Sequence, residues 1–126
     1  MKFPRRVRLS TQAEFRYVFS SPLASKDAFF RVLGRANGEA YCRLGMAVSR
    51  KHCSTAVGRN RLKRIIRESF RRYHNEQDLL QGIDFVVLPT PRAASICNKK
   101  LDDSLRGHWQ ELRDIDARRT KNRTNH

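Results

Sequence analysis

The segment from Ala56 to Tyr73, AVGRNRLKRIIRESFRRY, constrains the fold more than any other part of the chain. Placed on a helical wheel at about 100° per residue, it separates into an apolar arc and a basic arc. The apolar arc consists of Leu62, Ile65, Ile66, Ser69, Phe70 and Tyr73. The basic arc consists of Arg59, Asn60, Lys63, Arg64, Arg67 and Arg71. The pattern therefore predicts an amphipathic helix that packs its apolar side on a core and presents a cationic side outwards.

The basic arc is crowded with like charges, because a basic residue recurs at every fourth position. Each such pair costs a few tenths of a kcal/mol in an isolated helix, and docked phosphates would relieve the repulsion and release counterions. The guanidinium fork of arginine also suits bidentate contacts with phosphate. The whole chain has 27 Lys and Arg against 12 Asp and Glu, a net charge of +15, which again favours a polyanionic partner. A merely solubilising face and a helix on a membrane surface remain the alternatives.

The remaining segments predict one α+β domain, residues 1–116, followed by a basic and disordered tail, residues 117–126. A capping box of Thr11 and Glu14 opens a short helix that ends near Ser20.

Three strands are expected, at residues 28–35, 40–49 and 83–88, and the Asn37-Gly38 turn signal predicts a hairpin between the first two. A last helix begins at Asn98, with Leu101, Leu105, Trp109 and Leu112 on one stripe. This order of helices and strands predicts that the helices pack on one small sheet.

Several classes of protein are excluded by what the sequence lacks. A transmembrane helix needs about 18 or more consecutive apolar residues, and no such run exists, nor does an apolar stretch follow the basic N-terminus. The cytoplasm is therefore the expected location. The three cysteines, Cys42, Cys53 and Cys97, are too few and too widely spaced for a disulfide framework or a zinc site. Histidines and carboxylates are scattered, so we expect no catalytic residue and no metal site in this chain.

One stretch resembles the signature of a known family. GMAVSRK at residues 45–51, followed by AVGRNRLKRIIRESFR at residues 56–71, is similar to the bacterial ribonuclease P protein component. The resemblance extends to the Phe15–Phe19 helix, to residues 84–87 and to the last helix, and so covers the chain from about residue 5 to 115.

The resemblance implies a small basic subunit bound to a larger catalytic RNA, which together remove the 5′ leader of precursor tRNA. The Mg²⁺ ions of that reaction would belong to the RNA active site, and neither a membrane nor an obligate protein partner is implied. The implied fold is α-β-β-β-α-β-α with a small mixed sheet and a left-handed crossover, as in a ribosomal protein domain. That order contains one strand more than the residue patterns reveal, and we place the additional strand near residues 47–51.

The resemblance also assigns roles to individual residues. The implied RNA-binding residues are Arg50, Lys51, Arg59, Asn60, Arg61, Lys63, Arg64, Arg67 and Arg71. Phe15 and Phe19 are implied to line the cleft that binds the single-stranded leader, with plain core packing as their alternative role. Arg61 lies off the basic arc, where an alternative role is to brace local structure through Glu68. A general RNA-binding protein or a ribosome-associated RNA chaperone is the competing function, and an architectural DNA-binding protein is a third.

Overall fold

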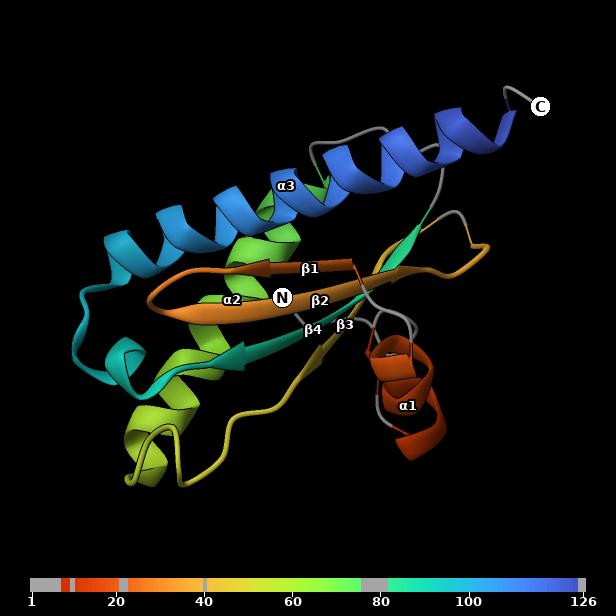
Figure 1. The fold of residues 1–126 in the computed structure, drawn as a ribbon. Helices are drawn as coiled ribbons and strands as arrows, with labels where there is room; N and C mark the ends of the chain where they lie inside the picture. The colour runs from red at the N-terminus through yellow and green to blue at the C-terminus, as the bar shows by residue number, and fades with distance from the viewer. Residues whose placement is uncertain (1–7, 10, 21–22, 40, 76–81, 125–126) are drawn as a thin grey trace.

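A four-stranded mixed sheet forms the centre of the protein, with helices on both faces (Figure 1). The structure is a computed structural model and describes residues 8–9, 11–20, 23–39, 41–75 and 82–124. The elements in chain order are α1 (Gln12–Ser20), β1 (Leu23–Lys26), β2 (Phe30–Ala36), β3 (Arg43–Met46), α2 (Ala56–Asn75), β4 (Ile83–Pro89), the 3₁₀ helix η2 (Pro91–Ser95) and α3 (Asn98–Thr124). The α+β class and the α-β-β-β-α-β-α order are confirmed.

The strand order in the sheet is β1-β2-β4-β3, so β4 occupies a central position. Its residues from Ile83 to Val87 are all buried, because helices cover this strand from both sides. The predicted hairpin between β2 and β3 is wrong, since β4 lies between them and pairs antiparallel with β2. The chain does turn at Gly38, which has a φ of 75°, but Asn37 bonds to Gly82 O just before β4 rather than to β3.

The crossover between β3 and β4 contains the basic helix. These two strands are parallel, and Figure 1 shows α2 passing behind the sheet between them in a left-handed sense. The additional strand is β1, which pairs antiparallel with β2. Its predicted position near residues 47–51 is wrong, because those residues form the loop before α2. β1 has only four residues, LASK, too few to show a strand period in the sequence.

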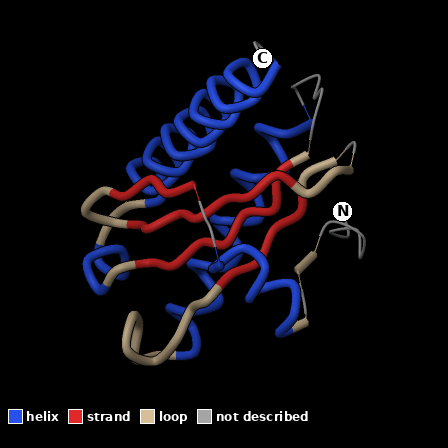
Figure 2. The backbone as a smooth tube through the Cα atoms, turned by 45° about the vertical axis from the view of Figure 1, so that its right-hand side comes forward, coloured by secondary structure: helices blue, strands red, loops and turns tan. Residues whose placement is uncertain are grey.

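The main hydrophobic core lies between the sheet, α2 and α3. All six residues predicted for the apolar arc of α2 are buried, and so are the four predicted for the stripe of α3. The Trp109 indole donates a hydrogen bond to Ser69 Oγ at 3.0 Å, which pairs the polar atoms that the two helices bury. Figure 2 shows α3 running along the β1 side of the sheet.

The last helix is longer than the sequence predicts. It continues to Thr124, past the expected end near residue 116, whereas we expected disorder from residue 117. Residues 117–124 contain neither glycine nor proline, so the sequence carries no stop signal there. The assignment of residues 1–116 as the RNA-binding domain stays a prediction. In the described part of the chain, no helix is both long enough and apolar enough to cross a membrane.

The opposite face of the sheet carries α1, which is held by a buried ion pair. Arg43 donates two hydrogen bonds to the fully buried Asp84 carboxylate, at 2.8 and 2.7 Å. These bonds raise the pKa of the Arg43 guanidinium. Its third nitrogen reaches Glu14 Oε2 at 3.0 Å. Glu14 also completes the predicted capping box with Thr11, which confirms it. The start of α1 is thereby fixed to two strands.

Removing the guanidinium should destabilise the fold strongly. Arg43→Ala leaves the Asp84 carboxylate buried without its ionic partner, and we expect a loss of about 3–5 kcal/mol in the free energy of unfolding. Urea denaturation measures this loss, with the exposed Arg31→Ala as control. Adding Asp84→Asn to Arg43→Ala should recover part of the loss, and no recovery would contradict the role given to the buried charge.

A half-buried histidine, His74, should make the stability depend on pH. His74 packs against the rings of Phe70 and Phe85, and Arg113 donates to its Nδ1 at 2.7 Å, which requires a neutral ring. Burial, followed by the charge of Arg113, lowers the pKa of His74 to about 3. The unfolded chain therefore takes up a proton near pH 6.5 that the folded chain does not, so stability falls as the pH drops from there towards 3.

His74→Phe should flatten this dependence by up to about 1.4 kcal/mol per pH unit between pH 6 and 4. Urea unfolding of both proteins at pH 7, 6, 5 and 4 measures the difference. Parallel stability curves for the two proteins would refute the assignment.

Candidate nucleic-acid interface

The outer side of α2 carries Asn60 and a row of cationic side chains that no residue described by the structure neutralises. Asn60, Arg64 and Arg67 are exposed, and Lys63 and Arg71 are half-buried. Within the described residues, none of these five side chains has a hydrogen bond or an ion pair. The neighbouring Arg72 differs from this row, because its guanidinium pairs with Asp102 of α3 at 2.8 Å. The face that was predicted for RNA therefore keeps its positive charge.

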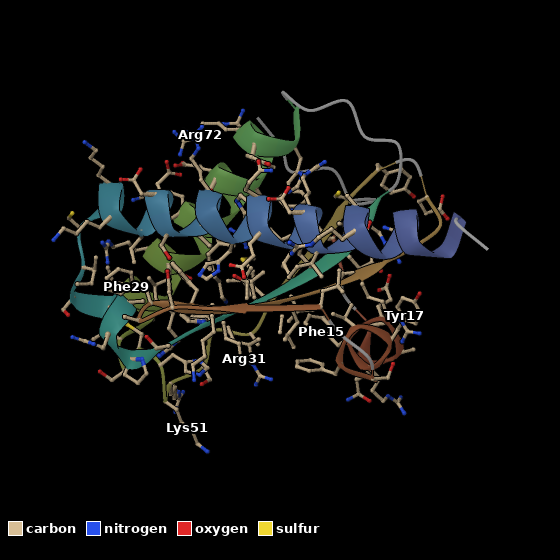
Figure 3. The ribbon with its side chains drawn as sticks, turned by 45° about the horizontal axis from the view of Figure 1, so that its top comes forward. Phe15, Tyr17, Phe29, Arg31, Lys51 and Arg72 are labelled. Carbon is tan, nitrogen blue, oxygen red and sulfur yellow. The ribbon has the colours of Figure 1, made fainter. Side chains whose placement is uncertain are left out.

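Arg59 holds the loop that precedes α2. Its Nη1 donates to the carbonyl oxygens of Cys53 and Ser54, both at 3.1 Å. Gly58 lets Cys53 of this loop pack closely on the first turn of α2, since a Cβ at residue 58 would lie 2.4 Å from the Cys53 sulfur. Cys53 is thus a packing residue at the start of the helix. The loop presents the exposed Arg50 and Lys51, and Figure 3 shows Lys51 pointing away from the body of the protein.

Arg61 is the one residue of the predicted RNA-binding set whose guanidinium is turned to the next elements of the fold. Its Nε donates to Asn98 Oδ1 at 3.0 Å, and its terminal nitrogens donate to the carbonyl oxygens of Ala94 and Ile96. These bonds hold the start of α3 against α2. Arg61 therefore has a structural role, but the predicted local brace through Glu68 is wrong, because its partners lie at residues 94–98.

The two predicted cleft aromatics differ in their surroundings. Phe15 is half-buried against the apolar cluster of Leu9, Val18, Leu33 and Val86, and Figure 3 shows it pointing from α1 towards Arg31. Its approach to the sheet requires Gly45, where a Cβ would lie 2.8 Å from Phe15 Cζ. Phe19 is 44% exposed. Phe15 thus takes part in core packing, while Phe19 keeps a large part of its surface exposed to solvent.

The position of α1 over the sheet is fixed at its far end by a second contact. The Arg35 guanidinium stacks on Tyr17, 4.0 Å from the ring centroid, and donates to Tyr17 O at 2.8 Å. The Tyr17 hydroxyl donates to Ala36 O at 2.8 Å. Both ends of α1 are therefore tied to the sheet, which keeps Phe15 and Phe19 in place.

Two cations on the sheet were missed by the sequence analysis. Lys26 of β1 and Arg31 of β2 are register partners, so their exposed side chains share the face that α1 covers only at one end (Figure 1). The alternation of Phe30, Arg31 and Val32 in β2 carried this signal, because it points the arginine away from the main core.

The edge strand β3 joins the two regions. An open hollow of about 210 Å³ beside it is lined by Arg8, Leu9, Leu44, Gly45, Met46, Lys63 and Arg67. Gly45 also contacts Phe15, so the basic face of α2 and the aromatic face of α1 meet at this strand. In the described residues, no group of three or more histidine, cysteine or carboxylate side chains is placed to hold a metal ion.

Comparison with known proteins identifies a single family. The family model described as Ribonuclease P matches residues 3–113. A ribonuclease P protein component from Methylococcus capsulatus is 45% identical over 107 residues, which cover 85% of this chain and 81% of the relative. The corresponding protein from Aliivibrio fischeri is 39% identical over 110 residues, covering 87% of this chain and 92% of the relative.

Solved structures agree with the sequence matches. The RNase P protein of Staphylococcus aureus superposes with a TM-score of 0.72 at 25% identity, covering 87% of this chain and 94% of that one. The RNase P protein of Thermotoga maritima gives a TM-score of 0.71 at 33% identity, covering 79% and 94%. The fold and the sequence therefore indicate the same family.

Arg61 and Arg64 offer a matched pair of substitutions that separates bracing from charge. Arg61→Ala should lower the free energy of unfolding by about 1 kcal/mol or more, because three acceptors on residues 94–98 lose their donor. Arg64→Ala removes the same group from an exposed position and should change stability by less than about 0.5 kcal/mol. Thermal unfolding followed by circular dichroism measures both, and equal effects would refute the distinction.

Proposed function

The chain belongs to the ribonuclease P protein family, and from this membership we propose that it is the protein subunit of a ribonuclease P. In that role it binds a catalytic RNA and the 5′ leader of precursor tRNA, and promotes removal of the leader. The observation that supports the proposal is the row of cations on α2, which no side chain in the described ranges neutralises, in a segment that falls within the family match.

The basic face of α2 is the proposed contact with the catalytic RNA. Asn60, Lys63, Arg64, Arg67 and Arg71 present donors on one side of a rigid helix. The opposite side of that helix is buried in the core, so the orientation of these donors is set before the RNA arrives. Phosphates that dock here replace the counterions that the like-charged row would otherwise hold. Arg50 and Lys51 extend this surface at the start of the helix.

The partly covered face of the sheet is the proposed leader site. Phe15 and Phe19 supply aromatic surface, and Lys26 and Arg31 supply charge on the same face. Stacking on aromatic rings tolerates any base, and cations beside them follow the backbone, which suits leaders of varied sequence. Phosphodiester hydrolysis would rely on Mg²⁺ bound by the RNA subunit, while this chain positions the substrate and reduces charge repulsion between the two RNAs.

A general RNA-binding protein or a ribosome-associated chaperone is the alternative. Either would bind RNA with a strong salt dependence, on the order of −0.7 in the log–log slope per phosphate on single strands. Neither would require a particular structured RNA or prefer precursor tRNA to mature tRNA. The RNA that the protein selects therefore separates the two functions. For a tRNA-processing subunit we expect a cytoplasmic location.

The deciding experiment is cleavage of a 5′-extended precursor tRNA at low millimolar Mg²⁺. The reactions contain the protein alone, the catalytic RNA of the same organism alone, and both together. We expect efficient cleavage at the mature 5′ end only with both. Equal rates with and without the protein would favour the general RNA-binding function, and cleavage by the protein alone would reveal an active site in this chain.

The leader site has its own readout in the same reactions. Phe19→Ala should raise the KM for a precursor with a long leader, and leave unchanged the KM for one with a single-nucleotide leader. Because Phe19 is 44% exposed, thermal stability should hold. A marked loss of stability with an unchanged KM would show that Phe19 packs in the core and does not contact the leader.

A further inference from the structure

The hollow beside β3 combines cations of the proposed RNA-binding face with groups that lie outside that face. Three of its lining residues are cationic, Arg8 from the N-terminal segment and Lys63 and Arg67 from α2. The rest of its wall is apolar or backbone, from Leu9, Leu44, Gly45 and Met46. A phosphate needs only the cations, whereas an apolar floor inside a cationic rim suits a nucleobase with its phosphates.

The backbone of β3 adds hydrogen-bonding groups to this wall. β3 is an edge strand, and of the described N-terminal residues Arg8 forms an isolated bridge with Leu44, in which Leu9 N donates to Leu44 O at 2.9 Å. Ala47 N donates to Val87 O at 2.9 Å on the other side, towards β4. Because the direction of backbone groups alternates along a strand, the N–H and C=O of Met46 point away from β4, to the edge where the hollow lies.

We propose that this hollow holds one unstacked nucleotide of the catalytic RNA, with its base against the partly buried Met46. The outward N–H and C=O of Met46 offer the base edge one donor and one acceptor, and Lys63 and Arg67 contact the flanking phosphates. The inference rests on the proposed function and adds a place on the protein where an individual base is recognised.

The charge of the rim decides between possible occupants. An exposed strand edge could also accept a strand from another protein. Arg67 is exposed and Lys63 half-buried, and the part of the chain that the structure describes shows no carboxylate paired with either. Two cations one helical turn apart, at the rim of a hollow with room for a flat group, match a nucleotide better than a neutral peptide backbone.

The test is chemical probing of the reconstituted complex of protein and catalytic RNA. Dimethyl sulfate and a carbodiimide modify the accessible Watson–Crick edges of the four bases between them. The wild-type protein should protect one unpaired base in the RNA. Arg67→Ala should restore its reactivity, and Met46→Trp, which fills the hollow, should do the same and weaken RNA affinity about tenfold.

Arg64→Ala is the matched control, because it removes an arginine from the same face that does not line the hollow. It should weaken RNA binding and leave that base protected. If no base depends on both Met46 and Arg67, the inference is wrong, even when the wild-type protein binds the RNA and supports cleavage. Failure of the wild-type protein to bind or to assist cleavage would instead overturn the proposed function itself.

Two further outcomes address other occupants. Circular dichroism checks that Met46→Trp is folded. If this variant is unfolded, the proposal is tested by the comparison of Arg67→Ala with Arg64→Ala alone. Lower thermal stability of folded Met46→Trp with unchanged RNA protection would show that the chain itself fills the hollow. Unchanged protection in every variant would show that the protected base does not lie in the hollow. Either result overturns the proposal.

Discussion

The ion pair between Arg43 and the buried Asp84 is the interaction on which the rest of the binding surface depends. It joins the edge strand to the central strand, and its third bond, to Glu14, draws α1 onto the sheet. With α1 fixed there, Phe15 packs over Gly45, and no other described helix covers this face of the sheet. A hydrophobic contact could supply similar stability, but it would not set the direction of α1, because only the directional bonds of a guanidinium do so.

The basic helix separates its two tasks by side. Every apolar residue of its inner arc is committed to the core, and this commitment lets the outer arc tolerate a row of like charges. Not all of its arginines are part of that outer row. Arg59 holds the preceding loop and Arg61 holds the start of the last helix, so one continuous basic motif combines residues of the proposed RNA-binding face with structural residues.

The sequence was sufficient for α2 and α3, because their apolar residues repeat with the helical period over many turns and packing follows that period. The order of the strands in the sheet could not be predicted in this way. The turn at Asn37 and Gly38 is real, but a local signal cannot show that a strand from more than forty residues later will enter between its arms. β1 was too short to detect. For the site, charge patterning located the basic face, whereas the role of Arg61 depended on tertiary contacts with residues 94–98, and Arg31 was overlooked although its alternation was visible.

The central place of β4 has a consequence for the order of events during synthesis. Strands β2 and β3 have no direct pairing with each other, so the sheet cannot close until residues 83–89 have left the ribosome. Until then, the apolar side of α2 has neither β4 nor α3 to cover it, and its cationic side is already present. Long-range pairing of this kind slows folding and exposes apolar surface in the meantime. The nascent chain thus passes through a stage in which it exposes apolar surface and a dense positive charge together, close to ribosomal RNA.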